Sequence, residues 1–164
     1  MTDMEPTPRA ASRPKSWLVF GLLLAAVGGA ALVQWWPDGR IKADPADAAQ
    51  VAAGKIVYEQ YCAACHGDRL QGQPAWKKRL PSGRMPAPPH DESGHTWHHP
   101  DPVLFGIVRD RLVPPHAPQG YESDMPAFGD RLSDEQIWAV LAYIKSHWSP
   151  KIQALHARKT DQSR

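Results

Sequence analysis

The longest uninterrupted apolar stretch of the chain lies close to its start. No charged or strongly polar residue occurs between Trp17 and Val33, and Trp35 and Trp36 follow almost directly. An apolar run of about twenty residues with tryptophans near both ends matches the thickness of a lipid bilayer and its interfaces. The pattern therefore predicts that residues 16–36 form one transmembrane helix, which anchors the chain in the lipid bilayer.

The charges beside this run predict its orientation. Residues 1–15 form a polar tail that carries Arg9, Arg13 and Lys15. Because basic residues favour the cytoplasmic side of a span, we expect a cytoplasmic N-terminus and a remainder that is exported across the membrane. A cleaved signal peptide is the alternative, since the small residues at 28–31 could be a cleavage site. The anchor is favoured because the run is longer than the apolar region of a usual signal peptide and ends in two tryptophans.

Residues 37–46 are interpreted as a short linker between this span and the rest of the chain. Ten extended residues reach at most about 35 Å. The part that follows would therefore stay near the membrane, which restricts its partners to proteins in or on the same membrane.

The polar and apolar positions after the linker predict helices. The segment from Asp47 to Tyr61 contains no proline, and Gly54, Tyr58 and Cys62 recur on one helical face at i, i+4 and i+8. Gly54 would let another helix approach closely.

A last helix is expected to begin at Ser133, which has capping-box spacing to Gln136, and to stop before Pro150. A shorter helix is expected from Asp101 to about Arg109. The last helix carries an apolar stripe that we expect to pack against Gly54 and Tyr58, formed by Ile137, Val140, Leu141 and Ile144. The helices place one domain at residues 47–149, followed by a C-terminal tail at 150–164.

The chain has two cysteines, in Cys62-Ala63-Ala64-Cys65-His66. A C-x-x-C-H run is the signature of covalent c-type haem attachment, in which two thiols bind the porphyrin and the histidine binds the iron. A thioredoxin-like redox pair and half of a zinc site are the alternatives. No strand precedes the motif and no further cysteine exists, so we expect Cys62 and Cys65 to hold haem covalently and His66 to be its proximal axial ligand, with its other ring nitrogen donating to a backbone carbonyl.

The function depends on the sixth iron ligand, for which Met125 is the candidate. It lies 59 residues after His66 in a proline-stiffened loop, Asp124-Met125-Pro126, just before the last helix. Met/His ligation raises the reduction potential and leaves no open position, which suits electron transfer. Met85 also precedes a proline but lies only 19 residues from His66. It is expected to pack against the porphyrin edge.

Composition adds two constraints. Eleven of the seventeen prolines lie between Pro74 and Pro126, so the middle of the chain is expected to be mostly loop. The formal charge is only +2 with acids and bases interspersed, which gives no case for nucleic-acid binding. A basic cluster at residues 77–84 could steer an acidic partner or be a solvated loop.

These motifs together resemble one family, the class I c-type cytochromes, in their bacterial membrane-anchored single-haem form. The resemblance covers residues 47–149 and rests on Gly54-x-x-x-Tyr58-x-x-x-Cys62, the C-x-x-C-H run, Met125-Pro126-Ala127-Phe128-Gly129, and Leu141-Ala142-Tyr143-Ile144. It implies an all-α fold wrapped round one haem c. It also implies a haem domain on the periplasmic side of a bacterial inner membrane. There it would transfer single electrons between membrane redox complexes, from a quinol-oxidising donor to a terminal oxidase or reductase.

The segment from Gln73 to Gly120 departs from the family pattern because it is long and rich in possible metal ligands: His90, Asp91, His95, His98, His99, Asp101 and His116. These residues could form an accessory copper or zinc site. Alternatively, Trp97 and one neighbouring histidine contact a haem propionate while the others lie at the surface.

The sequence thus predicts a membrane-anchored cytochrome c that cycles between Fe(III) and Fe(II) in the respiratory chain and catalyses no bond-making reaction, so that it is not itself an enzyme. Two rivals remain: a haem-based sensor or enzyme in which the Met125 bond is labile, and a metal-handling protein that uses the histidine-rich segment 90–116.

Overall fold

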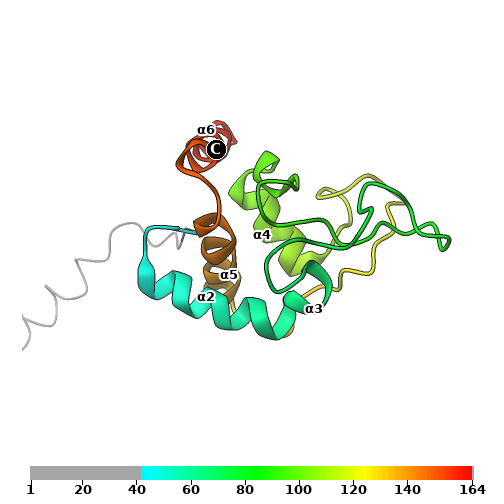
Figure 1. Ribbon diagram of the computed structural model, residues 1–164, viewed down its shortest axis with the longest axis horizontal. Helices are drawn as coiled ribbons and strands as arrows, with labels where there is room; N and C mark the ends of the chain where they lie inside the picture. Colours follow the sequence, from blue (N-terminus) through cyan, green and yellow to red (C-terminus); the bar gives the residue numbers. More distant parts are fainter. Residues whose placement is uncertain (1–41, 164) are drawn as a thin grey trace, which may run out of the picture. The chain divides into compact units, whose positions relative to one another are not determined.

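In the computed structural model, which describes residues 42–163, helices are the regular elements of the fold (Figure 1). In chain order they are α2 (Ala48–Tyr61), α3 (Ala63–His66), the short 3-10 helix η1 (Thr96–His98), α4 (Asp101–Asp110), α5 (Asp134–Ser146) and α6 (Pro150–Gln162). The one β-type pairing within the described residues is an isolated bridge between Met85 and Ser123. The all-α prediction is therefore confirmed for this part of the chain.

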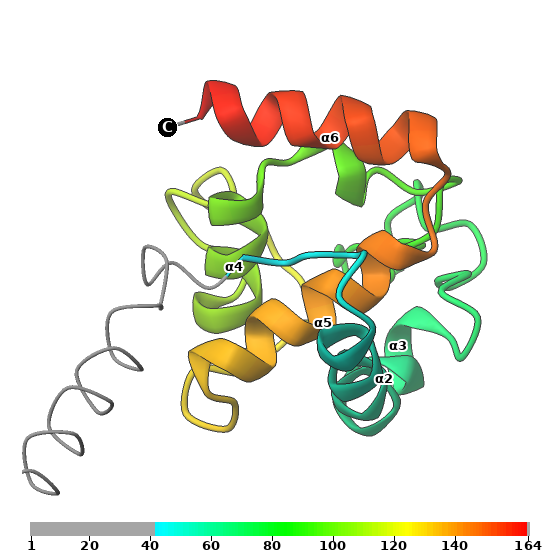
Figure 2. The ribbon, with the colours of Figure 1, turned by 90° about the vertical axis from the view of Figure 1, so that its left-hand side faces the viewer.

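Helices α2 and α5 cross at Gly54, as the sequence predicts. A Cβ atom at Gly54 would lie only 1.9 Å from the carbonyl oxygen of Ala139, so the two backbones are in direct contact there. One helical turn further along α2, the Tyr58 ring lies 5.3 Å from the Tyr143 ring of α5, centroid to centroid. The crossing joins the helix that precedes the C-x-x-C-H run to the main core helix (Figure 2).

The N-terminus of each of these two helices is capped by a side chain close to it in the sequence. Asp47 accepts hydrogen bonds from the backbone N–H groups of Ala49 and Gln50 at the start of α2. Ser133 and Gln136 form a complete capping box at the start of α5, because each side chain bonds to the backbone of the other residue. These caps satisfy N–H groups that a helix leaves unpaired.

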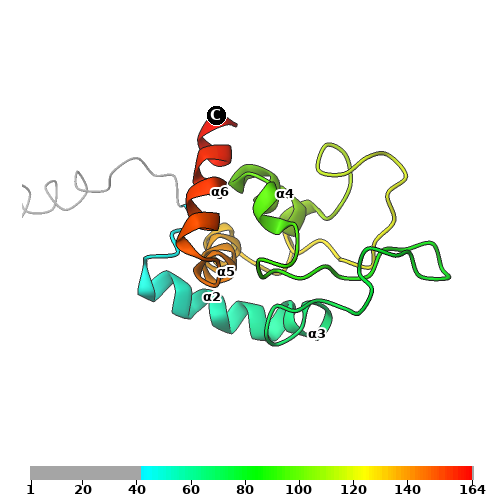
Figure 3. The same cartoon turned by 45° about the horizontal axis from the view of Figure 1, so that its top comes forward.

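The segments between α3 and η1 and between α4 and α5 are long loops that project together on one side of the helices (Figures 1 and 3). They are joined by the Met85–Ser123 bridge and by an exposed ion pair between Arg84 and Asp124. The proline-rich middle of the chain is thus loop, as expected, and the structure shows that two of its parts meet beside Met125.

Helix α6 differs from the expectation of a tail at residues 150–164. Ser149 and Pro150 occupy the N-cap and first positions of a helix in which His156 and Thr160 are buried. This helix packs on η1 (Figure 2). Proline at the first helical position is a sequence signal that the tail interpretation left unused.

The predicted anchor at residues 16–36, the tail at 1–15 and the first half of the linker, residues 37–41, lie outside the described residues. Among residues 42–163, no helix has both the length and the apolar character needed to cross a membrane.

Candidate functional site

The C-x-x-C-H run lies at the junction of α2 and α3. Cys62 is both the C-cap of α2 and the N-cap of α3. Its N–H donates to the Tyr58 carbonyl oxygen (2.9 Å), and the His66 N–H donates to the Cys62 carbonyl oxygen (2.9 Å). Cys62, Cys65 and His66 are therefore held within about one helical turn. All three line the same cavity.

The His66 ring has a defined tautomer. Its Nδ1 lies 2.8 Å from the carbonyl oxygen of Pro88, which can only accept, so Nδ1 carries the proton and Nε2 has a free lone pair. Burial lowers the pKa of His66, and the hydrogen bond to Pro88 opposes part of this shift. The ring is therefore neutral near pH 7, in the form that binds a metal ion. One ring nitrogen thus donates to a backbone carbonyl, as expected.

The two cysteines are not joined to each other, and both are free thiols. Burial, together with the neighbouring Cys65, raises the pKa of Cys62 to about 12. Cys62 is therefore protonated at neutral pH, and its thiol points to a cofactor reaction rather than to the low-pKa thiolate of a thioredoxin-like pair.

The cavity has a volume of about 340 Å³ and mostly apolar walls. Helix α4 contributes Leu104, Ile107 and Val108, and helix α5 contributes Val140, Leu141 and Ile144. The apolar stripe of α5 therefore both packs the core and covers a ligand site. Such a cavity, with a few polar groups at defined places, is typical of a cofactor site.

Both methionines that precede prolines line this cavity, and they enter it from different loops. Met125 lies in the loop before α5, where its N–H donates to Ser123 Oγ (3.1 Å). Met85 lies three residues before Pro88, the residue whose carbonyl oxygen holds His66. Met85 thus belongs to the loop that supports the histidine, whereas Met125 comes from a loop that makes no such contact.

The histidine-rich segment does not gather into one metal centre. Among residues 42–163, no three His, Cys, Asp or Glu side chains are placed to hold a metal ion together. The His90 ring stacks on His66 at 3.8 Å, His98 stacks on Trp97 at 3.7 Å, and His116 lies 3.7 Å from an Asp110 carboxylate oxygen.

The expected contact between Trp97 and a propionate is not supported. The indole N–H of Trp97 donates to the carbonyl oxygen of Glu92 (3.3 Å), and Trp97 is not among the residues that line the cavity. Its neighbours His95 and His99 do line it. Position in the sequence did not predict which side chains line the cavity, because adjacent residues of the η1 turn differ: Thr96 lines it and Trp97 does not.

Three features of the site were missed from the sequence. The Pro88 carbonyl oxygen contacts His66 Nδ1, and α4 residues form an apolar wall. The His90 ring stacks on His66, and its buried Nδ1 has no hydrogen-bond partner among the described residues. Only the α4 wall had a local signal, in the apolar residues Leu104, Ile107 and Val108 of the predicted helix.

Comparison with known proteins identifies the family. Residues 49–144 match the family described as "Cytochrome C oxidase, cbb3-type, subunit III". The chain belongs to this family. The resemblance to class I c-type cytochromes is thereby confirmed, and so is the cofactor: a cytochrome c domain of this type carries covalent haem c and takes part in electron transfer.

Two oxidase subunits and a dehydrogenase are among the curated relatives. The chain is 37% identical over 101 residues to the cbb3-type cytochrome c oxidase subunit CcoP of Azospirillum sp. (strain B510), a match that covers 60% of this chain and 29% of the relative. It is 34% identical over 98 residues to the CcoP subunit of Azospirillum brasilense, covering 60% and 28%. It is 32% identical over 115 residues to a thiosulfate dehydrogenase of Stutzerimonas stutzeri (strain A1501), covering 70% and 33%. The chain thus spans about a third of the length of these relatives, and no solved structure matches it significantly.

The expectation that the chain is not an enzyme is overturned by these matches. A thiosulfate dehydrogenase is an enzyme, and the CcoP subunits are components of an enzyme. Electron transfer by a haem domain and membership of an enzyme are compatible, because such a domain can be the electron-carrying part of a catalytic complex.

The described residues fit a covalently held haem. Two free thiols and a neutral imidazole with an available Nε2 line an apolar cavity, and a thioether from a separate loop also lines it. This donor set agrees with the c-type pattern of two thioether bonds and Met/His ligation.

Proposed function

We propose that the chain is a membrane-anchored cytochrome c subunit that passes electrons on the periplasmic side, from a quinol-oxidising donor complex to a terminal oxidase. The proposal rests chiefly on one observation: the thiols of the C-x-x-C-H run, a neutral His66 and the thioether of Met125 line the same cavity in a chain of the cbb3 subunit III family. When bound, haem supplies a one-electron Fe(III)/Fe(II) couple.

In this proposal the protein residues have separate roles. Cys62 and Cys65 would form the thioether bonds, and His66 would bind the iron through Nε2 because Pro88 occupies Nδ1. Met125 would supply its thioether sulfur as the second iron ligand. Pro126 stiffens the loop that carries Met125, and the Ser123 hydroxyl accepts a hydrogen bond from the Met125 N–H. A site held from two loops changes little when the iron changes oxidation state, which favours fast electron transfer.

The test compares two variants of the full-length, haem-loaded protein in detergent: Met125→Ala and the matched control Met85→Ala. We expect wild type and Met85→Ala to show the near-infrared methionine-to-iron band and to ignore CO when reduced. Met125→Ala is expected to lose the band and bind CO. The reverse pattern would identify Met85 as the ligand, and CO binding by wild type would support a haem-based sensor or enzyme with a labile distal bond.

The membrane anchor at residues 16–36 and the linker at 37–46 remain part of the proposal. A short linker supports a dedicated subunit of one complex rather than a mobile shuttle. We expect a soluble truncation that begins at residue 42 to carry haem but to support less oxidase turnover in membranes than the anchored chain. Equal turnover by both forms would contradict this.

The proposed electron donor can be tested against thiosulfate, the substrate in the name of the third relative. The family match and two of the curated relatives favour an oxidase complex, whereas one relative is a thiosulfate dehydrogenase. We expect quinol plus the membrane donor complex to reduce the haem and thiosulfate alone to leave it oxidised. Rapid reduction by thiosulfate would instead assign the chain to thiosulfate oxidation.

A further inference from the structure

Within residues 42–163, the cavity lacks the arginine and lysine side chains that usually bind a cofactor with two carboxylates. Haem carries two propionate groups, and proteins commonly bind carboxylates with arginine or lysine. Among the described residues that line this cavity, there is neither arginine nor lysine. The side chains there that can become cationic are histidines, so an imidazole is the available positive partner.

Three of the five histidines that line the cavity are already engaged. His66 donates to Pro88 and is the proposed iron ligand. His90 stacks face to face on His66 at 3.8 Å. His116 lies against Asp110 (3.7 Å) and its ring covers Gly106, where an added Cβ would lie 2.0 Å from the ring. His95 and His99 remain.

His95 and His99 lie at the mouth of the cavity, since His95 is exposed and His99 is half-buried while both line it. Their rings meet edge to face at 5.4 Å, and the other side of His95 stacks in parallel on Trp76 at 5.4 Å. They flank η1, in which the His98 N–H donates to the His95 carbonyl oxygen (2.9 Å). The two imidazoles thus form one wall that reaches solvent.

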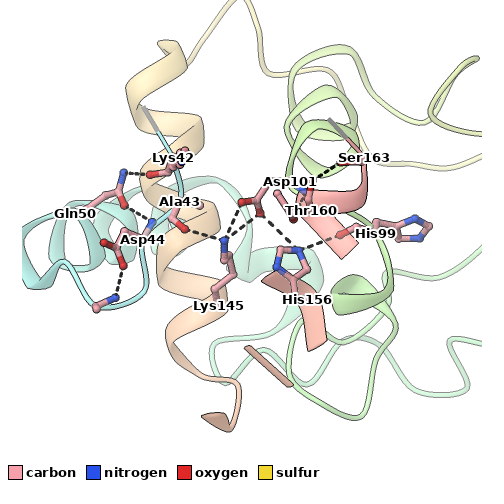
Figure 4. A network of polar contacts seen from close by, with 11 residues as sticks. Lys42, Ala43, Asp44, Gln50, His99, Asp101, Lys145, His156, Thr160 and Ser163 are labelled. Carbon is pink, nitrogen blue, oxygen red and sulfur yellow. Dashed lines mark hydrogen bonds and ion pairs between the residues drawn. The ribbon is translucent and has the colours of Figure 1, made fainter. Parts of the chain in front are cut away.

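Helix α6 holds this wall from behind. The His156 ring donates through Nε2 to the His99 carbonyl oxygen (3.0 Å), and the His99 imidazole points the opposite way (Figure 4). Thr96, between the two histidines, is buried and donates to the Pro89 carbonyl oxygen (3.4 Å). The positions of His95 and His99 are therefore set by buried contacts rather than by solvent.

We propose that His95 and His99 bind the haem propionates, and that this pair takes up one proton from solvent when the haem accepts one electron. The inference rests on the haem assignment proposed above. The balance is simple: a one-electron donor reduces the iron, the site gains one negative charge, and one imidazole becomes an imidazolium. Oxidation reverses both events, and the proton returns to solvent.

The electrostatic surroundings act on the two imidazoles in opposite directions. Burial lowers the pKa of His95, and His98 and Lys77 lower it further; burial likewise lowers the pKa of His99, helped by His95, His98 and Lys159 of α6. Propionate carboxylates act in the opposite direction, since an anion favours the charged imidazole. An imidazole that is subject to both effects can change its protonation state when the charge at the iron changes by one unit.

The test is a redox titration of the full-length, haem-loaded protein in detergent over pH 5 to 9, with a chemical mediator as the electron donor. We expect the wild-type midpoint potential to fall as pH rises through the window between the ferric and ferrous pKa values. His95→Gln and His99→Gln should each weaken this dependence, and the double variant should abolish it. His147→Gln is the control, because His147 is exposed, does not line the cavity and is not among the groups that shift the pKa values of His95 and His99.

A second measurement uses the wild-type protein, and the histidine variants serve only to assign the NMR signals. The ring protons of His95 and His99 in the ferrous protein, followed by NMR, should titrate at a higher pH than in the haem-free chain. An unchanged potential-versus-pH slope in a double variant with normal haem spectra, or ring pKa values that do not rise with haem, would overturn this inference alone. Absence of covalent haem in wild type would overturn the proposed function as well.

Discussion

Lys145 Nζ lies 2.9 Å from Asp101 Oδ2, and both residues are buried. Lys145 is near the end of α5, and Asp101 begins α4. The same Nζ donates to the Ala43 carbonyl oxygen (2.7 Å), and the Asp101 N–H donates to Thr160 Oγ1 of α6 (3.1 Å; Figure 4). One ion pair therefore joins α4, α5, α6 and the start of the described chain.

Removing one charge of this pair is expected to destabilise the domain strongly. A buried charge that loses its partner typically costs about 3–5 kcal/mol. We expect Lys145→Met or Asp101→Asn to lower the free energy of unfolding by about this amount, measured by denaturant titration of the haem-loaded protein. Lys55→Met is the control, since the Lys55–Glu59 pair is exposed and such pairs contribute about 0–1 kcal/mol. Equal losses in Lys145→Met and Lys55→Met would contradict the buried role.

His156 is expected to make stability depend on pH. Burial is the main cause that lowers its pKa, against the raising effect of Asp101, so the folded protein keeps His156 neutral. The unfolded chain takes up a proton on this residue as pH falls through its ordinary value near 6.5, whereas the folded protein does so only at lower pH. Stability is therefore full above about pH 7 and falls below it.

The variant His156→Gln should lose less stability than wild type between pH 7 and pH 5, because glutamine does not titrate and can still donate to the His99 carbonyl oxygen. Thermal unfolding at several pH values measures this difference. Parallel curves for the two proteins would show that His156 does not contribute to the pH dependence.

Gly54→Ala should destabilise the fold although alanine is the better helix former. In an open helix position this change stabilises by about 1 kcal/mol. Here the new Cβ would lie 1.9 Å from the Ala139 carbonyl oxygen, so α2 and α5 must separate, and we expect a net loss of about 1–3 kcal/mol. The matched control is Ala53→Gly at an exposed neighbouring position, which should cost about 1 kcal/mol through propensity alone. A stabilised Gly54→Ala protein would show that the crossing is looser than described.

The Arg84–Asp124 ion pair is expected to hold the methionine loop, because Asp124 directly precedes Met125 and Arg84 precedes Met85. We expect Asp124→Asn to lower the temperature at which the near-infrared methionine-to-iron band is lost, without changing the unfolding temperature seen by far-ultraviolet circular dichroism. Both residues are exposed, so the effect should shrink at high salt.

Arg79→Gln is the control for this loop, since Arg79 bonds to the nearby Gly83 carbonyl oxygen and forms no ion pair in the part of the chain described here. Arg79→Gln and Asp124→Asn should therefore differ in the temperature at which the band is lost. Equal shifts in that temperature would mean that any change of charge in these loops has the effect, and not the specific Arg84–Asp124 pair.

The sequence by itself determined the parts of this protein whose physics is local. The C-x-x-C-H spacing places two thiols and an imidazole within one helical turn, Ser133 and Gln136 cap α5 through neighbouring residues, and Gly54 marks a helix crossing because it lacks a side chain. Each of these relations is carried by residues close together in the chain, so the spacing alone indicates the geometry.

The tertiary structure decided which distant groups meet. Of the five histidines in the segment 90–116, one stacks on His66, two lie at the mouth of the cavity, one stacks on Trp97 and one rests on Gly106. Likewise nothing local pairs Lys145 with Asp101 or places Pro88 behind His66. Proline-rich loops have no periodic pattern to show their direction, so their partners are selected by packing of the whole chain and only the fold reveals them.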